Sequence, residues 1–363
     1  MRSIKPLFSR SVKATAIVLA LLGLAGCKSI GPRTLPRDRF SYSAALAESW
    51  KDQMLLNLVK TRYLDLPIYL DVGQIVSGYT LETGVSIFGQ ASPQAMRGDT
   101  FGGLSASGTY TDRPTITYTP LTGEKFLQGF LMPINPARIF SLVQAGYAAD
   151  FILELGVESL NGLRNRPITL GSRQKPDPEF FRVLALMREI QDAGAVGLRI
   201  EAPTNGLPAS VLFFRSDKIE PAMQAKIAEV RELLGLTPGQ SAFRLVQSPL
   251  RGSAGELGIT TRSLIQVMAA LSLGVEVPPS HQQRKLTPPI PAVPVGEEPL
   301  LRVHSGSTEP VEAFAAVAYE GEWFWIANDD WKSKRTFSSI LFLFTLADMG
   351  ASQNLPTITI PAQ

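Results

Sequence analysis

Two stretches decide the fold: YTLETGVSIFG, residues 79–89, and FGGLSASGTYT, residues 101–111, in both of which apolar residues alternate with small polar ones. A period of two is typical of β-strands, because successive side chains of a strand point to opposite faces. Turn-forming residues separate the stretches at 91–100, and Asp112-Arg113-Pro114 indicates a further turn. We therefore predict a set of antiparallel β-hairpins between residues 68 and 119.

A helix is predicted before the hairpins, over residues 41–64. Its apolar residues recur at helical spacing, and Pro67 stops it. Such a stripe could bind a partner, but packing onto the protein's own core is the commoner explanation. The residues of the stripe are Tyr42, Leu46, Trp50, Met54, Leu55, Leu58, Val59 and Tyr63.

Helices and strands alternate after the hairpins. Asn135-Pro136 indicates the start of a helix that ends near Gly146, and Asn161-Gly162 indicates a turn. Thr260 or Thr261 is the expected cap of a later helix that runs to 273. The other predicted helices are 178–193, 221–234 and 331–347, and the predicted strands are 151–160, 196–201, 210–215, 243–247, 314–319, 322–327 and 357–360.

These elements predict the α+β class, with an N-terminal helix plus antiparallel β-hairpins followed by one or two small α/β sandwich-like units. A polar run at 171–176 is a plausible domain boundary, and the Pro-rich segment 278–299 is typical of a linker or long surface loop. The predicted domains are a helix and hairpin domain at 40–170, an α+β domain at 177–277 and a C-terminal α+β segment at 300–363.

The first 26 residues have the layout of a secretory signal. A basic leader without acidic residues, containing Arg2, Lys5, Arg10 and Lys13, precedes an apolar run at 14–22. A helix that crosses a bilayer needs about 20 apolar residues, and this run is too short to serve as a comfortable permanent anchor.

The four residues Leu24-Ala25-Gly26-Cys27 resemble the lipobox of bacterial lipoproteins. The resemblance implies that Cys27 is joined by a thioether to diacylglycerol, that the chain is cut before it, and that the new amino terminus is acylated. Several acyl chains hold a protein on a membrane far more strongly than one. Cys27 is also the sole cysteine, so no internal disulfide is possible and its thiol is accounted for by the lipid.

Residue 28 bears on sorting within the envelope. Lipoproteins with Asp after the cysteine tend to stay at the inner membrane, whereas this chain has Lys28. The resemblance therefore implies an outer-membrane anchor facing the periplasm, with residues 27–39 as a solvated tether.

Removal of the leader changes the charge balance. It carries four basic side chains and no acidic ones, so the formal net charge falls from +3 to −1 when it is cleaved. The mature chain therefore gives no argument for a nucleic-acid partner, which would require a basic surface. The expected partners are the membrane, reached through Cys27, and envelope proteins or further copies of the chain.

The usual markers of catalytic, cofactor and metal sites are missing from the sequence. The two histidines, His281 and His304, lie outside any metal-spacing motif, and no Walker, dinucleotide or nucleophile-elbow motif occurs. His304 and Ser305 are adjacent, but a strand would direct them to opposite faces. We therefore predict no catalytic residue, cofactor or metal ligand, and name Cys27 as the only site.

Carboxylates and aromatic residues offer weaker candidates for a glycan enzyme. Glu154, Glu158, Asp329 and Asp330 could supply an acid pair. However, the first two fit the wet face of a strand, and Asp330 fits a helix N-cap. The aromatic cluster Trp323, Phe324, Trp325, Trp331, Phe337, Phe342 and Phe344 could stack on sugars, although core packing is favoured, and Lys332, Lys334 and Arg335 fit a solvated helix face.

Three functions are compatible with these features of the sequence. The leading hypothesis is an envelope lipoprotein with a structural, assembly or partner-binding role. The alternative is an oligomeric outer-membrane pore or export accessory, in which each copy contributes the 79–111 hairpin, because membrane strands of about 9–11 alternating residues fit this segment. The third is a carboxylate-dependent cell-wall or glycan hydrolase.

Overall fold

The computed structural model describes residues 31–76, 79–90, 101–122, 126–167, 175–201, 209–215, 217, 219–289 and 299–347. Helices occur together with antiparallel and mixed sheets, which confirms the predicted α+β class. The chain divides into two units, Met1–Trp50 with Gly73–Thr117, and Lys51–Val72 with Tyr118–Gln363. Each is described by itself.

The predicted N-terminal helix is present as α2 (Gly31–Arg62), and it begins ten residues before the predicted start. Part of the predicted tether is therefore helical, although Pro36 within it donates no helical hydrogen bond. The predicted stripe packs into the core only from Met54 onward, where Leu55, Leu58 and Val59 are fully buried, whereas Trp50 is half exposed.

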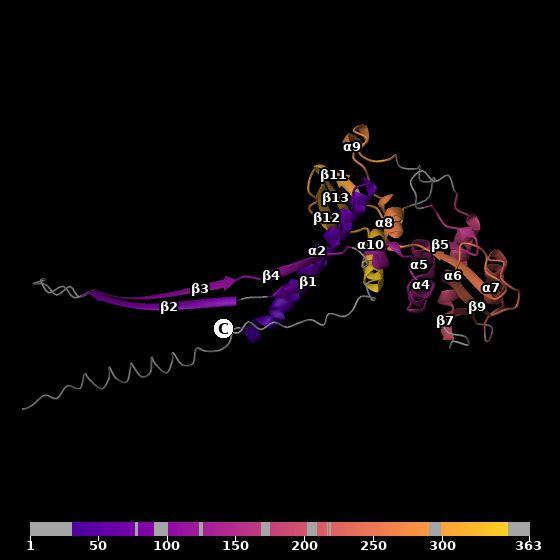
Figure 1. Cartoon of the computed structure of the whole chain (residues 1–363), viewed down its shortest axis with the longest axis horizontal. Coiled ribbons are helices and arrows are strands. Elements are labelled where there is room, and N and C mark those ends of the chain that lie inside the picture. The colour runs from indigo at the N-terminus through magenta and orange to yellow at the C-terminus, as the bar shows by residue number, and fades with distance from the viewer. Residues whose placement is uncertain are drawn as a thin grey trace, which may run out of the picture. The chain divides into compact units, whose positions relative to one another are not determined.

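The predicted hairpin region forms one nested hairpin. Strand β2 (Tyr79–Gln90) pairs antiparallel with β3 (Phe101–Asp112), and Figure 1 shows the two side by side. Strand β1 (Leu70–Val76) pairs in turn with β4 (Thr115–Pro120). The predicted turn at residues 112–114 is therefore wrong. A residue before proline is held extended, so Arg113-Pro114 interrupts the strand without reversing the chain.

A six-stranded sheet forms the centre of the second unit, in the order β6-β5-β10-β9-β8-β7. Neighbouring strands are antiparallel except β9 and β10, which run parallel. The sheet includes strands from both sides of the boundary predicted at 171–176. The bounds are β5 (Val157–Leu160), β6 (Leu163–Arg164), β7 (Val196–Glu201), β8 (Ala209–Phe214), β9 (Ala242–Gln247) and β10 (Glu256–Thr261).

The strand predicted at 151–160 is wrong in its first half, which is the helix α5 (Ala149–Gly156). Phe151, Ile152 and Leu153 are consecutive and all buried, and the less buried residues Asp150 and Glu154 mark only one turn, so this short helix displays little of its period. The change to strand follows Gly156, where an added Cβ would lie 2.7 Å from Ile139 Cδ1.

The helix predicted to start at Thr260 or Thr261 is displaced, because those residues end strand β10. Helix α8 (Leu264–Ser272) starts after Ser263. The Ser263 hydroxyl accepts from the backbone N–H of Gln266, and the side-chain oxygen of Gln266 accepts from the backbone N–H of Ser263. This reciprocal capping box supplies partners for amides that the first turn leaves unpaired. The prediction missed β10 and chose the wrong polar residue as the cap.

Most other predicted helices are confirmed. Asn135 Oδ1 accepts from the Ala137 amide at 2.8 Å and caps α4 (Pro136–Gln144), which contacts β7, β9 and β10. Helices α6 (Pro178–Asp192) and α7 (Pro221–Leu233) are followed, after one capping residue each, by Gly194 and Gly235, whose positive φ angles suit helix termination.

The C-terminal segment has a three-stranded sheet, in the order β11-β13-β12, and a helix. The predicted hairpin about Glu320-Gly321 and the predicted helix at 331–347 are confirmed, whereas the predicted strand at 357–360 lies outside the described residues. The Pro-rich segment starts with a short helix, α9, and its residues 290–298 are outside the described part. The bounds are α9 (Pro279–Gln283), β11 (His304–Gly306), β12 (Ala313–Tyr319), β13 (Glu322–Ala327) and α10 (Trp331–Ala347). A further short helix, η1 (Leu127–Leu131), precedes α4 in the chain.

Candidate functional site

The predicted lipidation site, Cys27, lies outside the described residues. Within the described ranges, no helix combines the length and the apolar character that a membrane crossing requires. The strongest candidate for a functional element is instead the pair of strands β2 and β3, which we call the ribbon.

The ribbon sorts its residues into two sets by register. Apolar residues face apolar partners across the strands: Leu81 pairs with Tyr110, Val85 with Ala106, and Ile87 with Leu104. At the intervening positions, Glu82 pairs with Thr109, Gly84 with Ser107, and Ser86 with Ser105. Directly opposed residues of an antiparallel pair share a face. The register therefore places these apolar pairs on one face of the ribbon, called the apolar parity, and the polar pairs on the other, called the polar parity. The last pairs of the polar parity, Phe88 with Gly103 and Gln90 with Phe101, bring two aromatic residues into it.

Most residues of the polar parity whose burial the structure describes are exposed, and Thr111 is half-buried. Glu82, Ser86, Ser105, Ser107 and Thr109 are all open to solvent. Close packing of this face is indicated at one point, where a Cβ added to the opposed Gly84 would lie 2.9 Å from the Ser107 hydroxyl. The polar face thus consists mainly of small, uncharged side chains.

Both outer edges of the ribbon are open among the described residues, because β2 and β3 make a sheet of only two strands. Each strand has twelve residues, and all twelve are paired without a register shift. An isolated two-stranded hairpin is only marginally stable in water, and an unpaired strand edge is a template for another strand. Both edges of the ribbon therefore have backbone groups with which a further strand could pair.

Two of the four carboxylates considered for glycan chemistry, Glu154 and Asp330, have structural partners. Glu154 lies on helix α5, and its carboxylate is 3.7 Å from Arg166 Nε. Asp330 Oδ1 accepts from the Ser333 amide at 3.0 Å, which confirms it as the predicted N-cap of α10. Glu158 lies on β5 and lines a cavity, and Asp329 lies in the turn before α10.

The two histidines lie in different parts of the second unit. His281 is buried on α9, and its Nδ1 is 2.6 Å from the Tyr63 hydroxyl. His304 lies on β11 with its Nδ1 3.3 Å from a Glu276 carboxylate oxygen. Since a buried Tyr–His hydrogen bond ties the end of α2 to α9, His281 has a structural role in packing.

The aromatic cluster is divided between core and surface. Phe324 and Phe337 are fully buried, whereas Trp331 is 63% exposed. Arg335 lies over the Trp331 ring, with its guanidinium carbon 5.5 Å from the ring centroid. The structure therefore supports core packing for part of the cluster, while Trp331 serves as a surface contact for a basic side chain.

Sequence reasoning missed the buried residue Arg262. Arg262 donates to the carbonyls of Glu154, Leu155 and Arg166, at 3.0, 3.3 and 2.6 Å. Two of these carbonyls lie in the last turn of α5, where a cation is favourable. Burial lowers the pKa of Arg262 to about 10, although Glu158 and Glu154 act in the opposite direction. No local pattern marks this residue, because its partners lie about 100 residues away in the chain.

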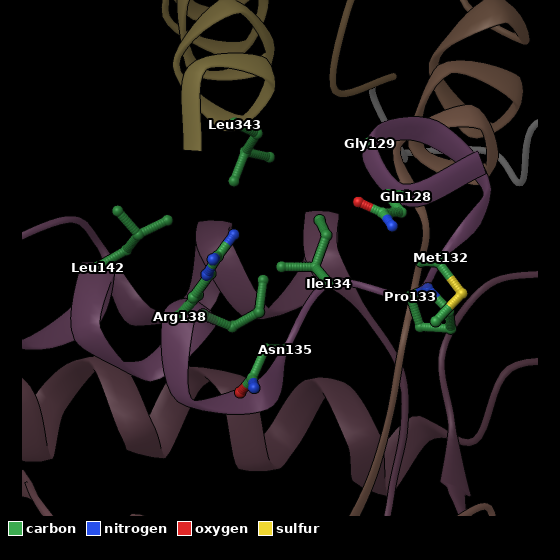
Figure 2. A pocket seen from close by; sticks show the side chains of 10 residues that line it. Gln128, Gly129, Met132, Pro133, Ile134, Asn135, Arg138, Leu142 and Leu343 are labelled. Carbon is green, nitrogen blue, oxygen red and sulfur yellow. The ribbon is translucent and has the colours of Figure 1, made fainter. Parts of the chain in front are cut away.

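The described part of the second unit contains cavities, of which two are prominent. The smaller, about 140 Å³, is lined by Arg138 and Leu142 of α4 and by Leu343 of α10, and Figure 2 shows these side chains beside Ile134. The larger, about 800 Å³, lies among β5, β6, β10 and α8. Its charged lining residues are Glu158, Arg164 and Arg166.

These charges are largely matched within the unit. Arg164 pairs with Asp177 at 3.2 Å, and Arg166 lies close to Glu154. Across the described ranges, no three His, Cys, Asp or Glu side chains form a group able to hold a metal ion. Neither cavity therefore carries a recognisable catalytic arrangement.

Comparison with known proteins gives no relative from which a site could be transferred. No protein-family model, curated protein or solved structure matches this chain. The amphipathic ribbon with open edges is accordingly the strongest candidate site in the described part of the chain.

Proposed function

We propose that this chain is an outer-membrane lipoprotein, anchored through Cys27, whose ribbon joins the ribbons of other copies to form the wall of a membrane pore. The observation that carries the proposal is the register of β2 and β3, which is uninterrupted over twelve positions. It places the pairs of Leu81, Val85 and Ile87 on one face and the pairs of Glu82, Gly84 and Ser86 on the other. The apolar parity would meet lipid, and the polar parity would line the water-filled passage.

The length of the strands supports a membrane role. Twelve residues at about 3.3 Å each extend about 40 Å, and a tilt of about 35–45° reduces the span along the membrane normal to about 28–32 Å. The hydrocarbon core of a bilayer is about 30 Å thick. The paired strands are thus as long as a membrane crossing requires.

The open edges support assembly from several copies. Backbone groups in hydrocarbon must all be hydrogen-bonded, so a sheet can cross a membrane only when it is closed on itself. Two strands cannot close, and the ribbon has no third strand among the described residues. Ribbons from neighbouring copies would pair edge to edge and satisfy both edges of every copy.

The lipid anchor fits the same proposal. Acylation at Cys27 would hold each copy at a membrane surface, which raises the local concentration of ribbons and lowers the cost of bringing copies together.

Partner binding is the second candidate, and the same open edges favour it. A strand from another envelope protein could add to the edge of β2 or β3 by main-chain hydrogen bonds. In that case the polar and apolar faces would both stay in water, and copies of the chain would not form a ring. Oligomeric state and conductance therefore separate the two candidates.

The experiment compares two substitutions at neighbouring positions of β2. Val85→Arg places a cation in the apolar parity, where it would cost about 2–4 kcal/mol per copy near the bilayer midplane. Ser86→Arg places the same side chain in the polar parity, where water is available. The lipidated protein and both variants are extracted in mild detergent, sized by light scattering, imaged by electron microscopy and tested for conductance in planar bilayers.

We expect rings and channels from the wild type and from Ser86→Arg, with altered conductance in the latter, and neither from Val85→Arg. A Cys27→Ala variant should lose its association with outer membranes on fractionation. A wild-type protein that is monomeric and gives no channels would refute the pore, and equal behaviour of the two arginine variants would refute the assignment of faces.

A further inference from the structure

The ribbon carries very few charges. Glu82 and Asp112 are the only ionisable acidic residues of β2 and β3, and neither strand contains lysine, arginine or histidine. Asp112 is paired with Tyr79 in the apolar parity, at the end of the ribbon. Glu82 is paired with Thr109 in the polar parity and is therefore the single charge of that face.

The surroundings of Glu82 leave the charge of its carboxylate without a neutralising neighbour. The side chain is exposed, and it makes no ion pair with any residue of the described part. The next opposed pairs of the same face, Gly84 with Ser107 and Ser86 with Ser105, are small, uncharged and exposed. No neighbouring cation along this face neutralises Glu82.

The place of Glu82 along the ribbon is also fixed by the register. It lies three residues after Tyr79 and eight before Gln90, or about 10 Å and about 26 Å along the strand. Glu82 therefore lies near the end of the ribbon that adjoins β1 and β4. The charges that lie next to the ribbon in the sequence occur as neighbours of opposite sign. Asp112 is followed by Arg113, and the connection at 91–100, outside the described residues, contains Arg97 and Asp99.

We propose that Glu82 makes the pore selective for cations, an inference that rests on the proposed function. With one copy of Glu82 from each protomer, the assembled wall carries a ring of carboxylates near one mouth. A ring of acidic side chains attracts cations and repels anions, and low-dielectric walls concentrate its field. The fixed charge acts over a Debye length of about 8 Å at physiological ionic strength.

The measurement is the reversal potential of wild-type channels in planar bilayers under a tenfold KCl gradient, for which ideal cation selectivity corresponds to about 59 mV. We expect a potassium to chloride permeability ratio several-fold above one. Glu82→Gln should bring this ratio close to one, and Glu82→Arg should bring it below one.

A matched control removes the other acidic residue of the ribbon. Asp112→Asn deletes the same charge at the apolar parity, so we expect it to retain the wild-type ratio. Selectivity should also weaken as KCl is raised from 0.1 to 1 M, because the Debye length falls from about 10 to about 3 Å.

The outcomes separate this inference from the proposal on which it rests. Channels whose permeability ratio is the same in the wild type and in Glu82→Gln would overturn the role of Glu82 and leave the pore standing. A wild type without conductance would overturn the pore and the selectivity together. A loss of selectivity in Asp112→Asn equal to that in Glu82→Gln would overturn the assignment of Glu82 to the water-filled side.

Discussion

Replacement of Asn161 by alanine is expected to destabilise the second unit by about 4 kcal/mol. Asn161 lies in the turn between β5 and β6, where it is 6% exposed and has a φ of +47°. Its Oδ1 accepts from the amides of Gly258 and Gly252, at 2.7 and 3.2 Å, and its Nδ2 donates to the Leu234 carbonyl at 2.9 Å. One side chain thus joins β10, the connection before it and the end of α7.

The magnitude follows from these contacts. Each buried hydrogen bond contributes about 1 kcal/mol net, and its loss leaves the partner group unsatisfied. Alanine also tolerates the left-handed conformation less well than asparagine, by about 1 kcal/mol. Asn161→Gly separates the two contributions, because glycine accepts the positive φ while it removes the three bonds, so we expect about 3 kcal/mol.

Asn135→Ala is the matched control. It removes the same side chain, but Asn135 is an exposed N-cap with one hydrogen bond to the helix, worth about 1 kcal/mol. All variants are compared with the full chain by urea unfolding followed by circular dichroism and tryptophan fluorescence, and the free-energy change is taken from the shift in midpoint at constant slope. An Asn161→Ala effect no larger than that of Asn135→Ala would refute the reasoning.

Three further substitutions test other features of the second unit. Glu320→Asn should stabilise the protein by about 0.5–1 kcal/mol in urea unfolding, because Glu320 has a φ of +51° in a two-residue hairpin turn that favours Asn before Gly; a loss of stability would contradict this. Hydrogen bonds from the Arg164 side chain and backbone amide lower the pKa of the Asp177 carboxyl group. This group therefore stabilises the folded state above the unfolded pKa of about 3.9, and the stabilisation is lost as the pH falls through the lower folded pKa. The difference in unfolding free energy between wild type and Asp177→Asn should therefore shrink in acid, and a difference that grows there would refute this assignment. Gly274→Ala should destabilise by about 3 kcal/mol or more in thermal unfolding, since the added Cβ would lie 1.8 Å from the Leu301 carbonyl oxygen, and an unchanged midpoint would show that the backbone yields easily.

Local signals in the sequence predicted the elements that depend on local physics. The alternation at 79–89 and 101–111 predicted the ribbon strands, and Asn135-Pro136 predicted the cap and first turn of α4. These patterns act within a few residues, so a single sequence displays them. The parity of each ribbon residue was predictable for the same reason, since alternation alone assigns faces.

Elements that depend on distant partners were not predictable. Helix α5 was taken for a strand because it is only eight residues long and most of them are buried, so little of its period is visible. Strand β10 was missed because its partners β5 and β9 define it more than its own residues do. The open edges of the ribbon, on which the proposed pore depends, likewise come from the pairing of strands. The buried role of Arg262 shares this limit, because its three carbonyl partners are set by the tertiary fold.

The place of β10 in the sheet also sets an order of events when the chain folds. Strands β5 and β6 can form a hairpin as soon as they exist, and β7, β8 and β9 can form an antiparallel meander, because each group is continuous in sequence. The last strand of the sheet to emerge, β10, is the one that lies between these two groups. A chain that emerges from its N-terminus thus holds two half-sheets, each with an exposed edge, until residue 261 arrives. During this interval a half-sheet of one chain can pair with the exposed edge of a half-sheet from a neighbouring chain before its own β10 is available. The yield of folded protein is therefore sensitive to how quickly β10 emerges.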